Sequence, residues 1–226
     1  MMNITVFGDS IARGIIYNER KSRYTISRDS FVERMRKRGI HLRNYSRMGF
    51  SSLRGKQTLD RHLAELCDAD YTLLEYGGND CDLNWQEISE NPFALHKATV
   101  SLDRFRSVIT SMIQTVRQAG STPVLMTLPP LDSSRFFQWV SRDLDWESIY
   151  EFLDRDLDNI GTWHDNYSQV LTEVAADQHI PLIDVRSAFL EQDDYRELLC
   201  ADGMHPNEKG HRLIEEQVAK TLIPTY

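Results

Sequence analysis

Short apolar runs recur along the chain, with the length and composition of β-strands. Most of them end at a glycine or a proline, so that each run stops abruptly. Continuous apolar strands of this length suit a sheet that is covered on both faces. The sequence therefore predicts five buried strands, at Ile4–Phe7, His41–Tyr45, Tyr71–Tyr76, Val124–Leu128 and Leu182–Val185.

Longer amphipathic segments separate these strands. Apolar side chains recur at helical spacing between residues 102 and 116, and Gly120 stands where such a helix would be capped. A second stripe runs from Trp163 to Val174, and a last helix is expected from about Asn207 to Leu222. Strands that alternate with helices indicate βαβ units in a parallel sheet, which binds ligands beyond the carboxyl ends of its strands.

The size and composition fit one soluble domain that spans residues 1–226. Of the 226 residues, 41% are hydrophobic and 27% charged, and no apolar run is long enough to cross a bilayer. The N-terminal residues lack the basic and apolar regions of a secretory signal. Cys67, Cys81 and Cys200 are an odd number without metal-ligand spacing, so we expect reduced thiols in a cytoplasmic protein.

The net charge of −8 is unevenly distributed. Residues 1–61 hold 14 Lys and Arg against 5 Asp and Glu, whereas residues 62–226 hold 12 against 29. The basic block Arg34–Arg38 could meet an anionic ligand. The whole chain is acidic and carries no nucleic-acid motif, so we expect acidic neighbours to balance this block and no nucleic-acid partner.

Three loops contain the side chains of a serine hydrolase. Gly8-Asp9-Ser10 follows the first strand, Gly77-Gly78-Asn79-Asp80 follows the third, and Asp202-Gly203-Met204-His205-Pro206 precedes the last helix. Such an enzyme needs a hydroxyl, an imidazole that takes its proton, and a carboxylate that orients the imidazole. Taken singly, each loop has a structural alternative, namely an N-capping serine, an Asx-turn at Asn79, and a surface Asp-Gly turn.

Two further positions bear on the site. Gly49 follows the second strand, and its N–H is a candidate oxyanion donor, although a structural turn is equally compatible with a glycine there. The segment Gly49-Phe50-Ser51-Ser52-Leu53 begins like a nucleophile elbow but lacks the final glycine, so Ser51 is not predicted to be the nucleophile.

In combination, these motifs resemble the SGNH (GDSL-type) hydrolases. The family has four short blocks in fixed order, and here they correspond to Gly8-Asp9-Ser10, Gly49, Gly77–Asp80 and Asp202–Pro206. One departure is Ile11, which stands where the family name has a leucine. The resemblance implies an α/β fold, a three-layer α/β/α sandwich with a five-stranded parallel sheet that is flavodoxin-like in order.

The resemblance also implies a role for each residue. Ser10 would be the nucleophile, His205 the general base and then acid, and Asp202 the residue that orients His205. The N–H groups of Ser10 and Gly49 and the side chain of Asn79 would form the oxyanion hole. Asp9 and Asp80 would support these groups, and no metal or cofactor is expected.

The aromatic and acidic stretch 133–165 is longer than a simple strand-to-helix connection. It is either a lid or wall of the substrate pocket, or a helix pair that packs on the core or on a second subunit of a homo-oligomer. The connection from Cys81 to Lys97 also carries aromatic residues. Neither segment shows a long apolar tunnel, which favours a small-molecule ester with a short acyl group, such as acetyl on a carbohydrate.

Three other functions remain open from the sequence. A lysophospholipase or acyl thioesterase would use the same triad on longer chains. A flavodoxin-like binding module without catalysis lacks support, because no Gly-rich phosphate loop is present. A metal hydrolase could gather Asp9, Asp80, Asp202 and His205 at the sheet edge, but no paired histidine spacing supports it.

Overall fold

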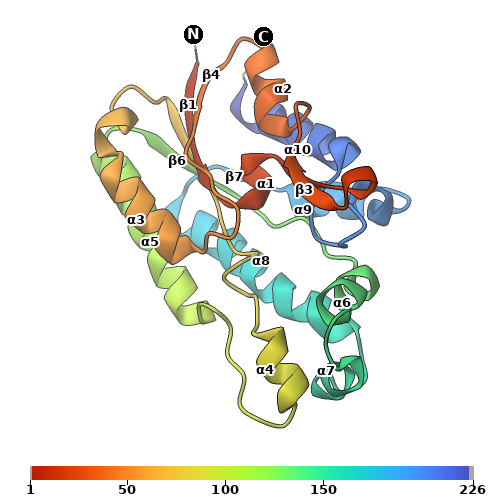
Figure 1. Ribbon diagram of the computed structural model, residues 1–226. Helices are drawn as coiled ribbons and strands as arrows, with labels where there is room; N and C mark the ends of the chain where they lie inside the picture. Colours follow the sequence, from red (N-terminus) through yellow and green to blue (C-terminus); the bar gives the residue numbers. More distant parts are fainter. Residues whose placement is uncertain (1, 224–226) are drawn as a thin grey trace.

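The computed structural model describes residues 2–223, so Met1 and residues 224–226 of the expected domain lie outside the described part. Its central sheet has five parallel strands in the order β4-β1-β5-β6-β7 (Figure 1). Their bounds are Asn3–Gly8 (β1), His41–Asn44 (β4), Tyr71–Glu75 (β5), Thr122–Met126 (β6) and Leu182–Ile183 (β7). The five predicted strands, their parallel pairing and the flavodoxin-like order are confirmed.

Helices cover both faces of this sheet and make the predicted three layers (Figure 1). Helices α3, α5 and α8 bury their apolar stripes against one face, in a core that includes Phe7, Leu74 and Tyr167. Helices α2, α9 and α10 cover the other face around Val6, Phe31 and Ile214. The helix bounds are Ser10–Arg13 (α1), Phe31–Lys37 (α2), Ser52–Arg61 (α3), Trp85–Glu90 (α4), Leu102–Gln118 (α5), Ser133–Ser141 (α6), Trp146–Phe152 (α7), Asp158–Gln178 (α8), Val185–Leu190 (α9) and Glu208–Leu222 (α10).

A β-hairpin that the sequence patterns did not predict follows the first helical turn. Helix α1 ends after one turn because Gly14 adopts a left-handed φ of 80°. Strands β2 (Ile15–Asn18) and β3 (Arg23–Ile26) then pair antiparallel as a separate two-stranded sheet. Their residues are mostly half-buried or exposed, so they lack the apolar signature of the central strands.

Two element boundaries differ from the expectation. Asp184 accepts a hydrogen bond from the Ser187 N–H and thereby caps α9, so the fifth strand ends at Ile183 and Val185 is helical. The last helix was expected to begin at about Asn207, but it begins at Glu208 because Asn207 is its cap residue, and Pro206 before it forms an isolated bridge with Leu199.

The long connections fold into a small separate group of helices beyond the carboxyl edge of the sheet. Helix α4 comes from the connection after β5, and α6 and α7 come from the stretch after β6. Helices α4, α6 and α7 lie together at one end of the molecule in Figure 1. Their buried side chains share a satellite core around Ile88, Phe136 and Ile149. The Trp163 indole donates to the Cys81 carbonyl at 2.8 Å and so ties α8 to the start of the first connection. The two connections therefore form one unit.

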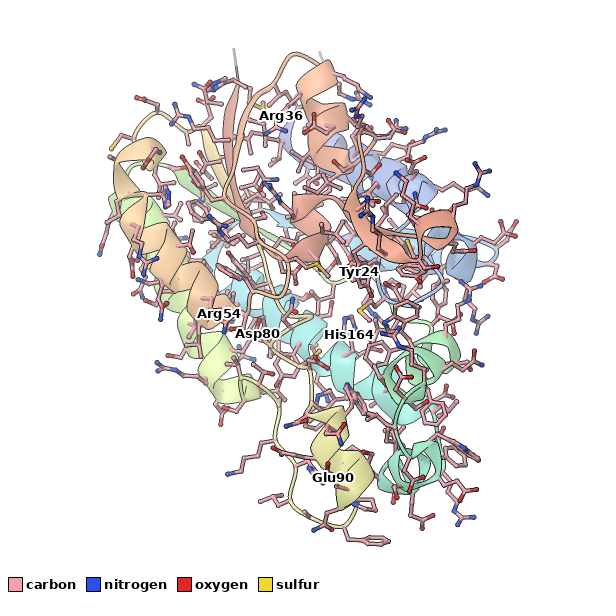
Figure 2. All side chains as sticks on the ribbon, viewed as in Figure 1. Tyr24, Arg36, Arg54, Asp80, Glu90 and His164 are labelled. Atoms are coloured by element: carbon pink, nitrogen blue, oxygen red, sulfur yellow. The ribbon has the colours of Figure 1, made fainter. Side chains whose placement is uncertain are left out.

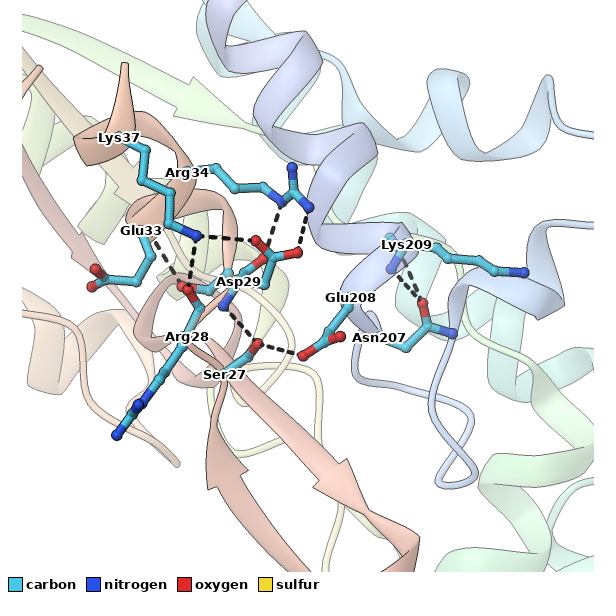
Figure 3. Close-up of polar contacts among 11 residues, drawn as sticks. Ser27, Arg28, Asp29, Glu33, Arg34, Lys37, Asn207, Glu208 and Lys209 are labelled. Carbon is cyan, nitrogen blue, oxygen red and sulfur yellow. Dashed lines mark hydrogen bonds and ion pairs between the residues drawn. The ribbon is translucent and has the colours of Figure 1, made fainter. Parts of the chain in front are cut away.

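Local carboxylates balance the basic block on α2. Arg34 and Lys37 both pair with Asp29 (Figure 3), and Arg36 and Arg38 pair with Glu33 and Glu215. The Ser27 hydroxyl donates to Glu208 at 3.1 Å, which joins the end of the hairpin to the first turn of α10. In residues 2–223, no helix is long and apolar enough to cross a membrane.

Candidate active site

The turn after β1 presents Ser10 at the carboxyl edge of the sheet. Asp9 caps α1, since its carboxylate accepts the Ile11 N–H at 2.9 Å, and this turn makes Ser10 the first helical residue. Gly8 is required just before it. A Cβ on Gly8 would lie 2.6 Å from the Cβ of Ala12 and 2.7 Å from a carboxylate oxygen of Glu75. Strand β1 thus ends in a tight turn that holds the serine on a rigid element.

The loop before α10 brings its histidine to this serine. The Nε2 atom of His205 lies 2.8 Å from the Ser10 Oγ, and the Nδ1 atom lies 2.7 Å from the Asp202 carboxylate. The other carboxylate oxygen of Asp202 accepts the N–H groups of Met204 and His205, each at 3.0 Å. Gly203 turns the loop with a φ of 71° and packs against the start of α6. Ser10 and His205, which are 195 positions apart in the sequence, therefore belong to one hydrogen-bonded chain with Asp202.

The environment of Asp202 suits a carboxylate that stays ionised. Its side chain is fully buried, and burial raises the pKa of this carboxyl. The hydrogen bond and charge of His205 and the two backbone donors outweigh burial and place the pKa below its usual value. An ionised Asp202 fixes the proton of His205 on Nδ1, which leaves Nε2 free to accept the serine proton.

The expected oxyanion donors lie beside Ser10. Gly49 and Asn79 line the same cavity as Ser10 and His205, and Gly49 has a left-handed φ of 75°. One N–H of the Asn79 amide donates to the Asp9 carboxylate at 2.9 Å. The amide has a second N–H, so Asn79 retains a donor for a ligand.

The two supporting aspartates have different surroundings. The Asp9 carboxylate accepts hydrogen bonds from the Ile11 N–H and the Asn79 amide. The buried Asp80 carboxylate accepts the backbone N–H and the hydroxyl of Ser52, and these bonds anchor the start of α3. Burial raises the pKa of Asp80 to about 6. Ser51, the residue excluded as nucleophile, is the N-cap position of α3 and precedes this contact. Within residues 2–223, no three His, Cys, Asp or Glu side chains are grouped to hold a metal ion.

An apolar cavity of about 490 Å³ opens from the triad toward the two connections. Its walls come from the loop after Asn79, from α6 and α7, and from the first half of α8. The apolar side chains that line it include Leu83, Trp85, Leu131, Phe136, Phe152 and Ile160. The segment 133–165 therefore supplies part of the wall of this cavity.

Sequence reasoning missed several polar residues of this cavity, among them Tyr24 and His164 (Figure 2). The ring of Tyr24, on the unpredicted hairpin, lies 5.1 Å from the ring of His205. Burial and the neighbouring Asp202 carboxylate raise the pKa of Tyr24, so its hydroxyl stays protonated. His164, on α8, is buried, and burial lowers its pKa. No local motif marks either residue, because the fold alone brings them to the site.

The sheet has a flavodoxin-like architecture, and Ser10, His205 and Asp202 form a hydrogen-bonded chain at its carboxyl edge. Together with a match to a family model, these features identify the protein as a carboxylic ester hydrolase. The chain belongs to the GDSL-like lipase/acylhydrolase family, whose model matches residues 6–213. A relative in Bacillus subtilis (strain 168), an uncharacterized lipoprotein named YqeF, is 22% identical over 96% of this chain and 87% of its own length.

Solved structures show the same fold at low sequence identity. A lipase/acylhydrolase from Enterococcus faecalis is 22% identical, with a TM-score of 0.69 over 97% of this chain and 94% of its own. A catalytic mutant of an acetylxylan esterase from Geobacillus stearothermophilus is 16% identical, with a TM-score of 0.67 over 99% and 95%. At this sequence identity, the similarity confirms the architecture but not the substrate.

Proposed function

We propose that this protein hydrolyses carboxylic esters through an acyl-enzyme on Ser10. The observation that carries the proposal is the pair of short contacts from His205, to the Ser10 Oγ at 2.8 Å and to Asp202 at 2.7 Å. His205 accepts the proton of Ser10 as the oxygen attacks the ester carbonyl, and then returns it to the leaving alcohol. Water hydrolyses the acyl-enzyme in a second cycle of the same steps.

In this proposal, three donors stabilise the negative charge that develops on the carbonyl oxygen. They are the N–H groups of Ser10 and Gly49 and the free N–H of Asn79. The start of α1 adds the positive end of a helical turn at the same place. Assay with a p-nitrophenyl ester tests the assignment, because Ser10→Ala should abolish hydrolysis and Ser51→Ala should leave it unchanged. Activity that survives in the Ser10→Ala variant would exclude this mechanism.

The cavity bears on the acyl group. The sequence favours a short acyl group, since it shows no apolar tunnel, whereas the folded connections enclose an apolar cavity of about 490 Å³. That volume lies in the usual range of small-molecule pockets, and an acetyl group would fill little of it. The apolar lining therefore supports the alternative of a longer acyl chain, as in a lysophospholipase or acyl thioesterase.

A chain-length series decides between the two acyl classes. We expect kcat/KM on p-nitrophenyl esters to rise from acetate to a chain of medium length, because each buried methylene contributes roughly 0.8 kcal/mol. A maximum at acetate would instead support the short-acyl function, which the names of the acetylxylan esterase neighbours also suggest. Either maximum is compatible with Ser10 as nucleophile.

We also propose a reducing location for the protein. Cys67 is exposed and free, and Cys81 and Cys200 are buried and free. Unpaired thiols are typical of proteins in the cytoplasm. Fractionation of the source cells, with detection of the native protein, tests this proposal, and recovery in the membrane fraction would overturn it.

A further inference from the structure

The mechanism above leaves one buried carboxyl beneath the nucleophile without a role. Glu75 is the last residue of β5, and its side chain is fully buried. Its Oε2 atom accepts the backbone N–H of Asp9 at 3.2 Å and that of Ala12 at 3.1 Å. These two donors lie on either side of Ser10 in the chain, so one carboxyl oxygen holds both ends of the nucleophile turn.

The turn is shaped around this carboxyl. A Cβ on Gly8 would lie 2.7 Å from the Glu75 Oε2, a distance that no ordinary side-chain contact reaches. The glycine of the Gly8-Asp9-Ser10 motif is therefore needed for Glu75 to enter the turn. The backbone and the carboxyl fit each other at the point from which the serine projects.

A second link runs from Glu75 through Asp9 to the proposed oxyanion donor. The Asp9 carboxylate accepts the Ile11 N–H and the Asn79 amide, both at 2.9 Å, and the Glu75 carboxyl lies within hydrogen-bonding reach of it. The other Glu75 oxygen, Oε1, is buried and has no donor among the described residues. An ionised carboxylate oxygen that is buried without a donor costs free energy, whereas a protonated carboxyl oxygen can donate a hydrogen bond to Asp9.

Two adjacent buried carboxyls do not both ionise. Burial and the Asp9 charge raise the pKa of Glu75 well above its usual value. Burial also raises the pKa of Asp9, but the Ile11 N–H, the charge of His205 and the Asn79 amide all favour its ionised form. The proton therefore resides on Glu75. The other titratable groups that interact electrostatically with this pair are Tyr76, Asp80, Cys81, His164 and His205.

We propose that Glu75, as a neutral carboxylic acid, is a positioning residue of this hydrolase. It fixes the turn that presents Ser10 and, through Asp9, orients the amide of Asn79 toward the oxyanion. The inference rests on the proposed function of Ser10. Glu75 does not touch the substrate, so its loss should lower kcat and leave KM nearly unchanged.

Two substitutions separate this role from simple packing. Glu75→Gln has the shape of a neutral acid, because its oxygen accepts the two N–H groups and its amide donates to Asp9. We expect its kcat on a p-nitrophenyl ester within about threefold of the wild type. Glu75→Leu keeps the volume but loses the acceptor and the donor, and its kcat should fall roughly 10²–10³-fold, as on loss of an oxyanion donor. Glu215→Gln, at a buried carboxyl on α10, is the matched control and should match the wild type.

The pH dependence of stability supplies a readout that packing does not move. A neutral Glu75 in the folded state binds a proton that the unfolded chain releases above about pH 4.5. Its contribution to stability is complete below that pH and decreases as the pH rises toward the folded pKa. The unfolding equilibrium constant of the wild type, relative to Glu75→Gln, should therefore increase by up to about tenfold per pH unit from about pH 5 to the raised pKa of the folded state, and become constant above it.

The outcomes are distinct. A Glu75→Gln variant that loses activity as severely as Glu75→Leu, or a constant ratio of unfolding constants, overturns the inference, and so does a fully active Glu75→Leu. If Glu75→Leu does not fold, the inference is tested by the activity of Glu75→Gln together with the pH dependence of the ratio of unfolding constants. Ser10→Ala is assayed in parallel, because activity without the serine hydroxyl would refute the proposed function whatever the Glu75 variants do.

Discussion

Removal of the Asn79 amide tests the oxyanion hole directly. Asn79 lines the cavity, and the Asn79→Ala variant loses both amide N–H groups, the one that donates to Asp9 at 2.9 Å and the one left for the oxyanion. Loss of one oxyanion donor raises the activation barrier by about 2.7–4 kcal/mol, so kcat should fall roughly 10²–10³-fold. KM should change little, because the donor acts on the transition state more than on the bound ester.

The same change should destabilise the fold to a measurable extent. Asp9 keeps the Ile11 N–H but loses its side-chain donor, and leaving a buried acceptor short of a partner costs about 1–3 kcal/mol. The assay is therefore run below the unfolding transition, with urea denaturation of the variant in parallel. Asn18→Ala, which removes a capping side chain in the turn of the hairpin, is the matched control and should keep wild-type kcat. A folded Asn79→Ala enzyme with wild-type kcat would remove Asn79 from the site.

Three further predictions follow from the same geometry. Asp202→Asn should lower kcat by about 10⁴-fold, because the amide no longer fixes the His205 tautomer, and a decrease below tenfold would contradict that role. Val140→Trp, which puts an indole into the cavity wall, should lower kcat/KM on the longest p-nitrophenyl esters at least about tenfold relative to acetate; unchanged chain-length preference would place the acyl group elsewhere. Burial lowers the pKa of His211 to about 4 from 6.5, so the contribution of His211 to the free energy of unfolding, taken as the difference between the wild type and His211→Leu, should hold above pH 6.5 and fall by up to about 3 kcal/mol toward pH 4. Urea denaturation of both proteins at several pH values measures this difference; a difference that is constant with pH would exclude His211 as the titrating group.

The sequence predicted the sheet and the triad because both depend on local signals. Apart from β4, whose residues His41–Asn44 are mostly polar, the strands of the sheet are apolar runs. The side chains of the triad follow a strand end or precede a helix, in short motifs of glycine and polar residues. Parallel strands bring their carboxyl ends to one edge, so the distant partners Ser10 and His205 meet there without any contact signal in the sequence. The order of the strands came from the family resemblance rather than from the pattern.

The hairpin and the cavity were not predictable in this way. Strands β2 and β3 pair only with each other and bury little, so Tyr24 reaches the site from a segment without an apolar pattern. The cavity is walled by α4, α6, α7 and α8, and no single one of these segments reads as a tunnel. Glu75 did leave a signal, because a charged residue at the end of a buried strand requires a partner. The partner of this carboxyl could not be predicted, because the fold alone places Glu75 against Gly8 and the Asp9 N–H.

The most direct measurement of the central claim is reaction with a fluorophosphonate probe, followed by peptide mapping of the modified residue. The probe reports an activated serine whatever the natural ester is. We expect a single adduct on Ser10, at a rate that falls strongly in a His205→Ala variant. An adduct on Ser51 or another serine, or undiminished labelling without the His205 imidazole, would contradict the assignment of the nucleophile and its base.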